Sequence, residues 1–391
     1  MANILLTGGR APAALELART FHKAGHTVFM AESLRGHLSQ PSNAIKANFI
    51  VPAPRQEKDA FLATLKKIIV ENKIDLLIPT CEEVFYIAMG LEQLPCIVFS
   101  EPIKKLNSIH NKWAFVINSV EQELSVPETM LINNTDDMLH AYAHWKELVF
   151  KPVYSRFAAR TLILPSLNQA SSTLNFNDNS AWVAQSYIEG KEFCTYSVVH
   201  NGHITAHTTY PSIFTAGQGA TIVFQHIDHP VIYDWINRFV KRNRFTGQIA
   251  FDFVETPDGQ ISALECNPRA TSGVHLLASH PQFAEAFLNP HLDCITPNNN
   301  HSYMLSTGML IYGLTAALKK KQFTNWLKTF STSSDLEDQY PLFDSWASKL
   351  VRNRHPEFGF VNFKSVLDLS RKLMTDKIKD HQELKMIIQS L

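Results

Sequence analysis

The chain has 391 residues, of which 45% are hydrophobic and 18% are charged, so we expect two or three folded domains with a sizeable core rather than disorder. Lys and Arg together number 36, as do Asp and Glu, and the formal net charge is zero. This balance argues against a protein that captures nucleic acid or an anionic membrane by its overall charge.

The five cysteines are scattered, and none forms a Cys-x-x-Cys pair. This pattern is typical of reduced thiols in a cytoplasmic protein rather than of a disulfide framework or a zinc site. The first residues lack the basic front and the cleavage site of a signal peptide, and no apolar run is long enough for a membrane-spanning helix. We therefore expect a cytoplasmic protein that binds neither nucleic acid nor a membrane.

Residues 1–110 alternate predicted strands with predicted helices, which predicts an α/β lobe built on a parallel sheet. Strands are expected at 4–6, 27–30, 49–51, 75–79 and 96–99, and helices at 12–23 and 58–71. Gly8 and Gly9 follow the first strand, but the Gly-x-Gly-x-x-Gly fingerprint of a dinucleotide site is absent.

Polar residues follow two of these strands, where parallel sheets bind their ligands. Arg10 comes after the first strand, and Glu82 and Glu83 come after the strand at 75–79. All three are candidates for holding a substrate. For the two glutamates, stabilisation by a helix dipole is an equally good explanation.

Farther along, residues 232–241 predict an amphipathic helix, and a carboxylate-bearing β-hairpin follows it. Asp252 stands in its first arm, a Pro-Asp-Gly turn occupies 257–259, and Glu265 and Asn267 stand in the second arm. Residues two apart on a strand point to the same face, and the hairpin can bring Asp252 beside them. Two carboxylates and an amide oxygen suit Mg²⁺. A structural ion pair is the alternative, because carboxylates among apolar neighbours must be paired, protonated or metal-bound.

The hairpin resembles the metal-binding end of the ATP-grasp superfamily, whose pattern is Asp, about a dozen residues, and then Glu-x-Asn-x-Arg. Asn111-Lys112, a strand at 149–152 with Lys151, and the segment 184–193 precede it in the family's order. The resemblance implies the ATP-grasp architecture. We expect an N-terminal lobe at 1–110, a nucleotide region at 111–300 with a smaller lid lobe at about 112–187, and a mainly helical region at 301–391.

The same resemblance assigns roles to single residues. It implies that Lys112 and Lys151 contact the phosphates of ATP, and that Mg²⁺, for which Mn²⁺ could substitute, binds Asp252, Glu265 and Asn267. The adenosine end of the site is implied to be formed by Gln185, Tyr187, Ile188 and Glu192. Arg269 would face the transferred group and act in catalysis together with Lys151.

Two segments depart from the family pattern. The loop at 154–160 has no glycine, so Arg156 and Arg160 could replace backbone amides in holding phosphate. Gln248 stands near the place where many family ligases carry an arginine, which leaves the substrate open.

Three other features are less specific. His275 could line a substrate pocket, although a lone histidine is more often structural. His226, Asp228 and His229 have the spacing of metal ligands, but their place in a loop before Pro230 favours surface polar residues. Helices expected at 305–318, 323–329 and from 364 onward could form a cap, a homodimer surface or a substrate lid.

The implied function is an ATP- and Mg²⁺-dependent ligase. It would join a small carboxylate to an amine through an acyl-phosphate and release ADP and phosphate. The Asn-Pro-Arg form of the motif resembles the carbamoyl-phosphate-synthase-like branch, so carboxyphosphate chemistry on bicarbonate is one alternative. A non-catalytic ATP-binding sensor is the other.

Overall fold

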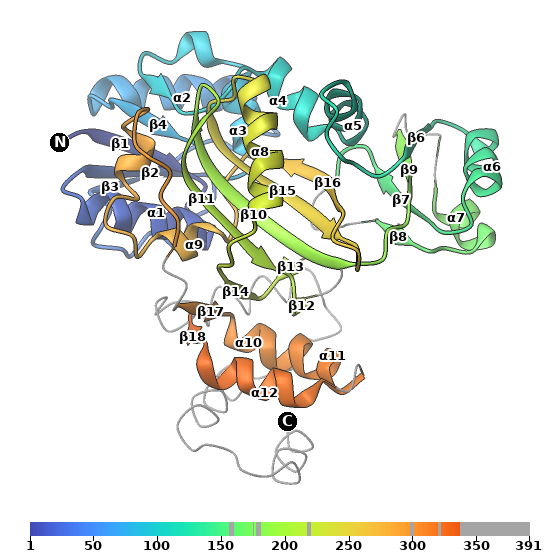
Figure 1. Cartoon of the computed structure of the whole chain (residues 1–391). Coiled ribbons are helices and arrows are strands. Elements are labelled where there is room, and N and C mark those ends of the chain that lie inside the picture. Colours follow the sequence, from blue (N-terminus) through green and yellow to red (C-terminus); the bar gives the residue numbers. More distant parts are fainter. Residues whose placement is uncertain are drawn as a thin grey trace.

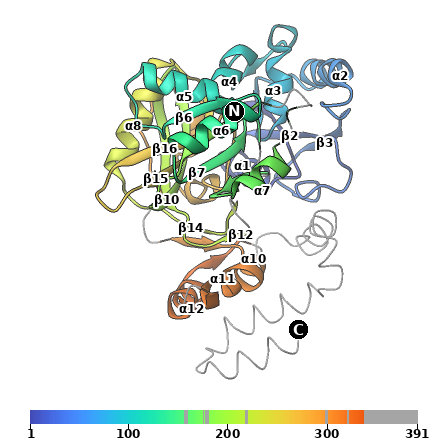
Figure 2. The same cartoon turned by 90° about the vertical axis from the view of Figure 1, so that its right-hand side faces the viewer.

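The structure, a computed structural model, describes residues 1–155, 160–174, 176, 181–216, 220–297, 301–319 and 322–336. Figure 1 shows an N-terminal α/β lobe, a central antiparallel sheet, a smaller lid sheet beside it, and a helical segment below. Figure 2 views the molecule from the side of the lid sheet. Within the described residues, no helix combines the length and the apolar character needed to cross a bilayer.

The N-terminal lobe is a five-stranded parallel sheet with the order β3-β2-β1-β4-β5. Its strands are β1 (Asn3–Thr7), β2 (Thr27–Glu32), β3 (Ala47–Ile50), β4 (Leu76–Ile78) and β5 (Ile97–Val98). Ile4 and Leu6 belong to the core that contains α1 (Pro12–Lys23), whereas Leu5 belongs to the core that contains α2 (Lys58–Glu71). This alternation follows from the strand's two-residue period. The predicted parallel sheet is confirmed, and both helices have the predicted bounds.

The lobe ends in short helices that lead into the rest of the chain. These are α3 (Glu83–Ala88), η1 (Leu91–Gln93), α4 (Ile103–His110) and α5 (Lys112–Glu121). Asn111 caps α5, because its side chain accepts a hydrogen bond from the Ala114 backbone N–H.

The central sheet is antiparallel and has the order β11-β10-β15-β16. Its strands are β10 (Lys191–His200), β11 (His203–Pro211), β15 (Gly247–Glu255) and β16 (Ile261–Asn267). The helix α8 (Pro230–Arg242) covers one face, where Trp235 and Phe239 pack on Phe251 with ring centroids 5.3 and 5.2 Å apart. Phe115 of α5 joins the same core. The predicted hairpin and the helix predicted at 232–241 are both present.

The lid sheet has the order β6-β9-β7-β8. Its strands are β6 (Thr129–Ile132), β7 (Leu148–Pro152), β8 (Leu162–Ile163) and β9 (Trp182–Ser186), and the helices α6 (Thr135–His144) and α7 (Leu167–Thr173) accompany them. Ile132, Phe150 and Trp182 form a core of its own. Since α5 packs on the central sheet, the lid sheet proper begins at β6 and not at Lys112.

The remaining elements form a smaller unit. Ile222 separates two short strands: β13 (Ala220–Thr221), which pairs with β12 (Thr215–Ala216), and β14 (Val223–Gln225). β14 pairs with β17 (Ser302–Met304), which pairs in turn with β18 (Ser334–Asp335). The short helices α9 (Val274–Leu277) and η2 (Glu285–Phe287) connect β16 to this unit.

The helix predicted at 305–318 consists of three pieces: α10 (Ser306–Gly308), the π-helical η3 (Met309–Gly313) and α11 (Leu314–Lys319). The Trp326 Nε1–H of α12 (Phe323–Thr332) donates to the Met309 carbonyl at 2.9 Å and competes with the regular helical bond. The helix predicted from 364 onward lies outside the described residues.

The aromatic core around Phe251 supports the hairpin from behind. We expect Phe251→Ala to lower the free energy of unfolding by about 3–5 kcal/mol, because it leaves a cavity among Phe115, Trp235 and Phe239. Urea unfolding followed by tryptophan fluorescence measures this loss. Val231→Ala, at a position that is 55% exposed on α8, is the control. Equal stability of Phe251→Ala and the wild type would contradict this packing.

Candidate active site

The hairpin of β15 and β16 places two carboxylates side by side. Asp252 pairs with Glu265 across the ladder, and Ala250 pairs with Asn267. Directly paired residues on one face are close neighbours. Gly259 has a φ of 84° in the connecting turn, a conformation that glycine adopts without strain. The register thus produces the juxtaposition of Asp252 and Glu265 that the spacing predicts.

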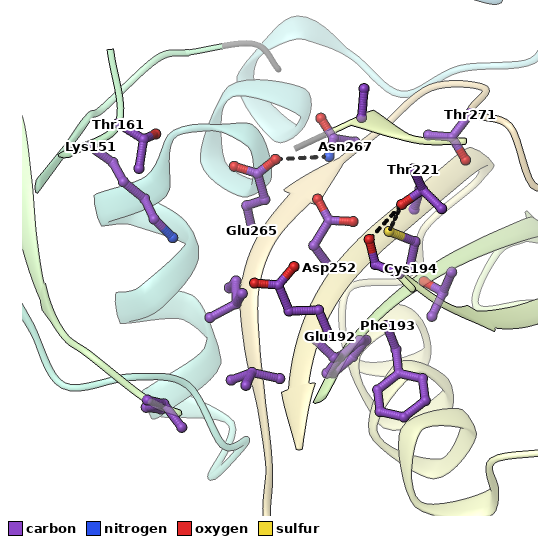
Figure 3. Close-up of a pocket in the computed structure, with 18 of the residues that line it drawn as sticks. Lys151, Thr161, Glu192, Phe193, Cys194, Thr221, Asp252, Glu265, Asn267 and Thr271 are labelled. Carbon is purple, nitrogen blue, oxygen red and sulfur yellow. Dashed lines mark hydrogen bonds between the residues drawn. The ribbon is translucent and has the colours of Figure 1, made fainter. Parts of the chain in front are cut away.

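A cavity of about 280 Å³ lies between the hairpin and the lid sheet. In Figure 3, Lys151 and Thr161 approach it from the lid sheet, while Asp252, Glu265 and Asn267 approach it from the hairpin. The predicted residues Lys151, Gln185, Tyr187, Ile188, Glu192 and Arg269 also line it. Residues from two separate sheets therefore meet in one space.

The two carboxylates have opposite electrostatic environments. Burial, and then the neighbouring charge of Glu265, raise the pKa of the Asp252 carboxyl to about 7. Burial acts in the same direction on Glu265, but the ammonium groups of Lys112 and Lys151 outweigh it and lower its pKa to about 2. Glu265 is therefore ionised at neutral pH, while Asp252 is only partly ionised there.

Two lysines supply the positive charge. Lys112 Nζ lies 3.1 Å from Glu265 Oε2 and donates to Ser155 Oγ at 3.0 Å. Its side chain is only 3% exposed. Lys151 lies on β7, and burial lowers the pKa of its ammonium while Glu265 opposes that shift.

Asn267 and Arg269 continue the same strand end. Asn267 Nδ2 donates to Glu265 Oε1 at 3.3 Å, and its Oδ1 accepts from Arg269 at 3.4 Å. The Arg269 Nε atom lies 3.0 Å from Glu82 Oε1. Glu82 thus reaches the site from the N-terminal lobe and orients the arginine.

The far end of the cavity is formed where the lid sheet meets the central sheet. Gln185 is buried, and its Nε2 donates to Thr129 Oγ1 at 3.1 Å, whereas its Oε1 has no hydrogen-bond partner among the described residues. The Tyr187 amide donates to the Glu147 carbonyl at 3.1 Å. Gly190 is required there, because a Cβ atom would lie 2.2 Å from the Glu255 carbonyl oxygen.

Of the two arginines in the loop at 154–160, the structure describes Arg160 alone. Arg156 lies outside the described residues. Arg160 has a φ of 63°, and its guanidinium lies over the Trp182 ring at 5.1 Å, so it stacks on the lid sheet and does not line the cavity.

The predicted substrate residues of the N-terminal lobe form a cluster at the strand ends. Arg10 NH1 lies 2.8 Å from Glu32 Oε1, and Arg10 NH2 lies 3.5 Å from Glu83 Oε2. Glu83 Oε1 also accepts from Thr7 Oγ1 at 2.8 Å. Neither Arg10 nor Glu83 lines the cavity.

Two histidine interpretations can be compared with the structure. His275 is buried, its Nδ1 lies 3.5 Å from Glu16 Oε2, and it does not line the cavity. The expectation of a surface position for His226 is wrong: it is 3% exposed, and its Nδ1 is 3.0 Å from Thr208 Oγ1. Packing of β14 against β11 buries it. His229 caps α8.

Several functional neighbours were not found by sequence reasoning. Ser155 and Glu32 are partners of Lys112 and Arg10, and Gln248 accepts from the Tyr196 hydroxyl at 2.6 Å and donates to the Pro79 carbonyl at 2.8 Å. Glu32 follows the apolar strand predicted at 27–30, and this position near a strand end is the sequence signal that could have identified it. Nothing in the sequence around Gln248 indicates its partners.

The metal-ligand set can be tested on this geometry. Among the described residues, no three His, Cys, Asp or Glu side chains gather as a metal site. Two carboxylates that line a cavity nevertheless fit Mg²⁺, which completes its shell with water and phosphate ligands. Asp252, whose pKa is raised to about 7, would become fully ionised beside such a cation. An oxygen ligand from Asn267 requires its amide to turn, because the nitrogen now faces Glu265.

Comparison with solved structures identifies the architecture. N5-carboxyaminoimidazole synthetase from Staphylococcus aureus with ADP has a TM-score of 0.64 at 13% identity, over 82% of this chain and 86% of that one. The chain has the ATP-grasp fold. No protein-family model matches this chain, and no curated protein is similar to it in sequence.

Two further structures share this fold. Biotin carboxylase from Campylobacter jejuni has a TM-score of 0.60 at 11% identity, over 77% of this chain and 74% of that one. L-amino acid ligase from Bacillus licheniformis has a TM-score of 0.54 at 15% identity, over 70% of this chain and 68% of that one. The predicted fold class is confirmed.

The raised pKa of Asp252 predicts a pH dependence of stability. The folded protein holds this proton more tightly than the unfolded chain, so the stabilisation is full below pH 4 and is lost as the pH rises through about 7. In the presence of a metal chelator, Asp252→Asn should therefore gain stability relative to the wild type as the pH rises from 5 to 8. Thermal unfolding of both proteins at pH 5 and at pH 8 measures this difference in stability. A difference that does not change with pH would contradict the raised pKa of Asp252.

Proposed function

We propose that this chain is an ATP-dependent ligase that joins a carboxylate to an amine. The observation that carries the proposal is that, in an ATP-grasp fold, the Asp252–Glu265 pair and Lys151 line one cavity, while Lys112 lies 3.1 Å from Glu265. Paired carboxylates opposite ammonium groups suit a metal-bound polyphosphate, because the metal and the lysines together neutralise its charge.

The adenosine end is supported by Gln185. Its Oε1 is a buried acceptor that still needs a donor, and the exocyclic amine of adenine is one. Since the Tyr187 amide is already bonded to Glu147, we assign the backbone contact with adenine to Ile188. The exposed carboxylate of Glu192 at the cavity wall would accept from the ribose hydroxyls.

Asp252 and Glu265 would hold Mg²⁺, with Asn267 as a third ligand, and the ion would neutralise and orient the phosphates when bound. Lys151 would hold the phosphate chain from the lid side. The guanidinium of Arg269, which Glu82 orients, would stabilise charge on the transferred phosphoryl group.

In the proposed reaction, a carboxylate oxygen attacks the γ-phosphorus of ATP, the bond to the bridging oxygen breaks, and ADP leaves. The amine nitrogen then attacks the acyl carbon, and phosphate leaves with the bonding electron pair while the amine loses a proton. The contribution of the chain is mainly positioning and electrostatic stabilisation.

Carboxyphosphate chemistry on bicarbonate is the second candidate. It is favoured by the structural similarity to N5-carboxyaminoimidazole synthetase and to biotin carboxylase. Bicarbonate would take the place of the organic carboxylate beside Arg269, and the rest of the site would act in the same way.

A substrate screen separates these functions. The full chain is incubated with ATP, Mg²⁺ and pairs of carboxylates and amines, with and without bicarbonate, and products are read by mass spectrometry and phosphate release. An amide product with ADP supports the ligase, and strictly bicarbonate-dependent ADP supports the alternative. ATP binding without ADP formation under any of these conditions would point to a non-catalytic sensor.

Removing the charge of Glu265 tests the metal ligand. We expect Glu265→Gln to lower turnover by roughly two orders of magnitude or more with the fold intact, because it removes a ligand and a counter-charge. Glu255→Gln is the matched control on the partner strand, where Glu255 pairs with His229 at 3.3 Å. Near-normal turnover of Glu265→Gln would refute the assignment.

Removing the ammonium of Lys151 tests the phosphate contact. Lys151→Ala should weaken ATP binding by roughly tenfold or more, because a point charge on the phosphates is lost. Isothermal titration calorimetry measures this change, and Lys146→Ala, an exposed position before the same strand, is the control. Unchanged ATP affinity in Lys151→Ala would refute the proposed contact between Lys151 and the phosphates.

A further inference from the structure

Lys112 occupies a buried position beside Glu265. It is the first residue of α5, its backbone N–H donates to the Val153 carbonyl at 3.1 Å, and its side chain is 3% exposed. Its ammonium lies between Glu265 Oε2 at 3.1 Å and Ser155 Oγ at 3.0 Å. Because the ammonium is buried and contacts both Glu265 and Ser155, its position is fixed, unlike that of a solvated surface charge.

Both carboxylate oxygens of Glu265 have partners in this arrangement. Oε2 faces Lys112, and Oε1 accepts from Asn267 Nδ2 at 3.3 Å. A divalent cation on Glu265 would bind these same two oxygens, and the ammonium in contact with one of them would repel it. Lys112 and a metal ion therefore compete for Glu265.

The second lysine is placed differently. Lys151 contributes positive charge near Glu265, but among the described residues the ion pair to Glu265 within 4.0 Å is formed by Lys112 and not by Lys151. The competition for Glu265 therefore depends on its direct contact with Lys112, and not only on the positive charge that both lysines bring near it.

We propose that Lys112 is an exchangeable counterion of Glu265 that keeps the metal site closed to a divalent cation until a nucleotide binds. The proposal rests on the function proposed above. The phosphates of ATP offer the ammonium a more highly charged partner than one carboxylate. When Lys112 turns to them, Glu265 is released to the metal, so metal and nucleotide enter together.

This exchange makes the two ligands thermodynamically coupled. If ATP strengthens metal binding by removing Lys112 from Glu265, metal must strengthen ATP binding by the same factor. Removing the Lys112 ammonium should abolish that part of the coupling, because Glu265 is then already free.

The test measures Mn²⁺ binding to the full chain, from the electron paramagnetic resonance signal of free Mn²⁺, without nucleotide. We expect Lys112→Met to bind Mn²⁺ about tenfold or more tightly than the wild type, since a competing unit charge in contact with the ligand is removed. In the wild type, ATP should increase Mn²⁺ affinity by a larger factor than in Lys112→Met.

Three variants serve as controls. Lys105→Met removes an equal charge from a partly buried pair, in which Lys105 lies 2.8 Å from Glu101, and it should leave Mn²⁺ binding unchanged. Lys151→Met removes a cavity lysine without that contact and should give a smaller gain than Lys112→Met. Glu265→Gln combined with Lys112→Met should lose the gain. If Lys112→Met does not fold, as judged by its melting temperature, Lys112→Gln is measured in the same way.

The outcomes separate the two levels of the proposal. Equal Mn²⁺ affinity in the wild type and in Lys112→Met, with loss of binding in Glu265→Gln, would overturn the counterion role and leave the metal site standing. An equal gain in Lys112→Met and Lys151→Met would also overturn it, in favour of a general field. Absence of both Mn²⁺ and ATP binding in every variant would overturn the proposed function as well.

Discussion

The arrangement of the site depends on two carboxylates that the hairpin register forces together. Asp252 and Glu265 are directly paired across two strands. Two negative charges on such neighbours inside a protein raise the free energy of the folded state unless a cation compensates them. The structure supplies two ammonium groups, and these suffice to keep Glu265 ionised but leave the pKa of Asp252 high. Burial and the charge of Glu265 keep this pKa high, and a bound cation would lower it.

The fold creates this situation by bringing separate sheets to one cavity. The aromatic core under α8 holds the hairpin from behind, the lid sheet carries Lys151 over it, and α5 inserts Lys112 from the side. The N-terminal lobe contributes Glu82, which orients Arg269 at the strand end. Lys112 and Arg269 are thus each paired with a carboxylate from another part of the chain.

The sequence predicts local structure and the hairpin well, because these depend on short-range patterns. The helices at 12–23 and 58–71 follow from the periodicity of their apolar residues, and the Asp252–Glu265 contact follows from the turn and the strand period. The π-helical segment at Met309–Gly313 could not be predicted, since it depends on a contact with Trp326. The partners of Gln248 are 52 and 169 positions away, and burial of His226 depends on how β14 packs.

In the proposed function, the carboxylate pair holds a metal together with a nucleotide. A crystal structure of the full chain with Mn²⁺ and an ATP analogue, which uses the anomalous signal of manganese, tests this role directly. We expect a manganese peak within coordination distance of both Asp252 and Glu265, with Lys112 turned from Glu265 to the phosphates. A bound nucleotide with no manganese at these carboxylates, or with Lys112 still paired to Glu265, would contradict it.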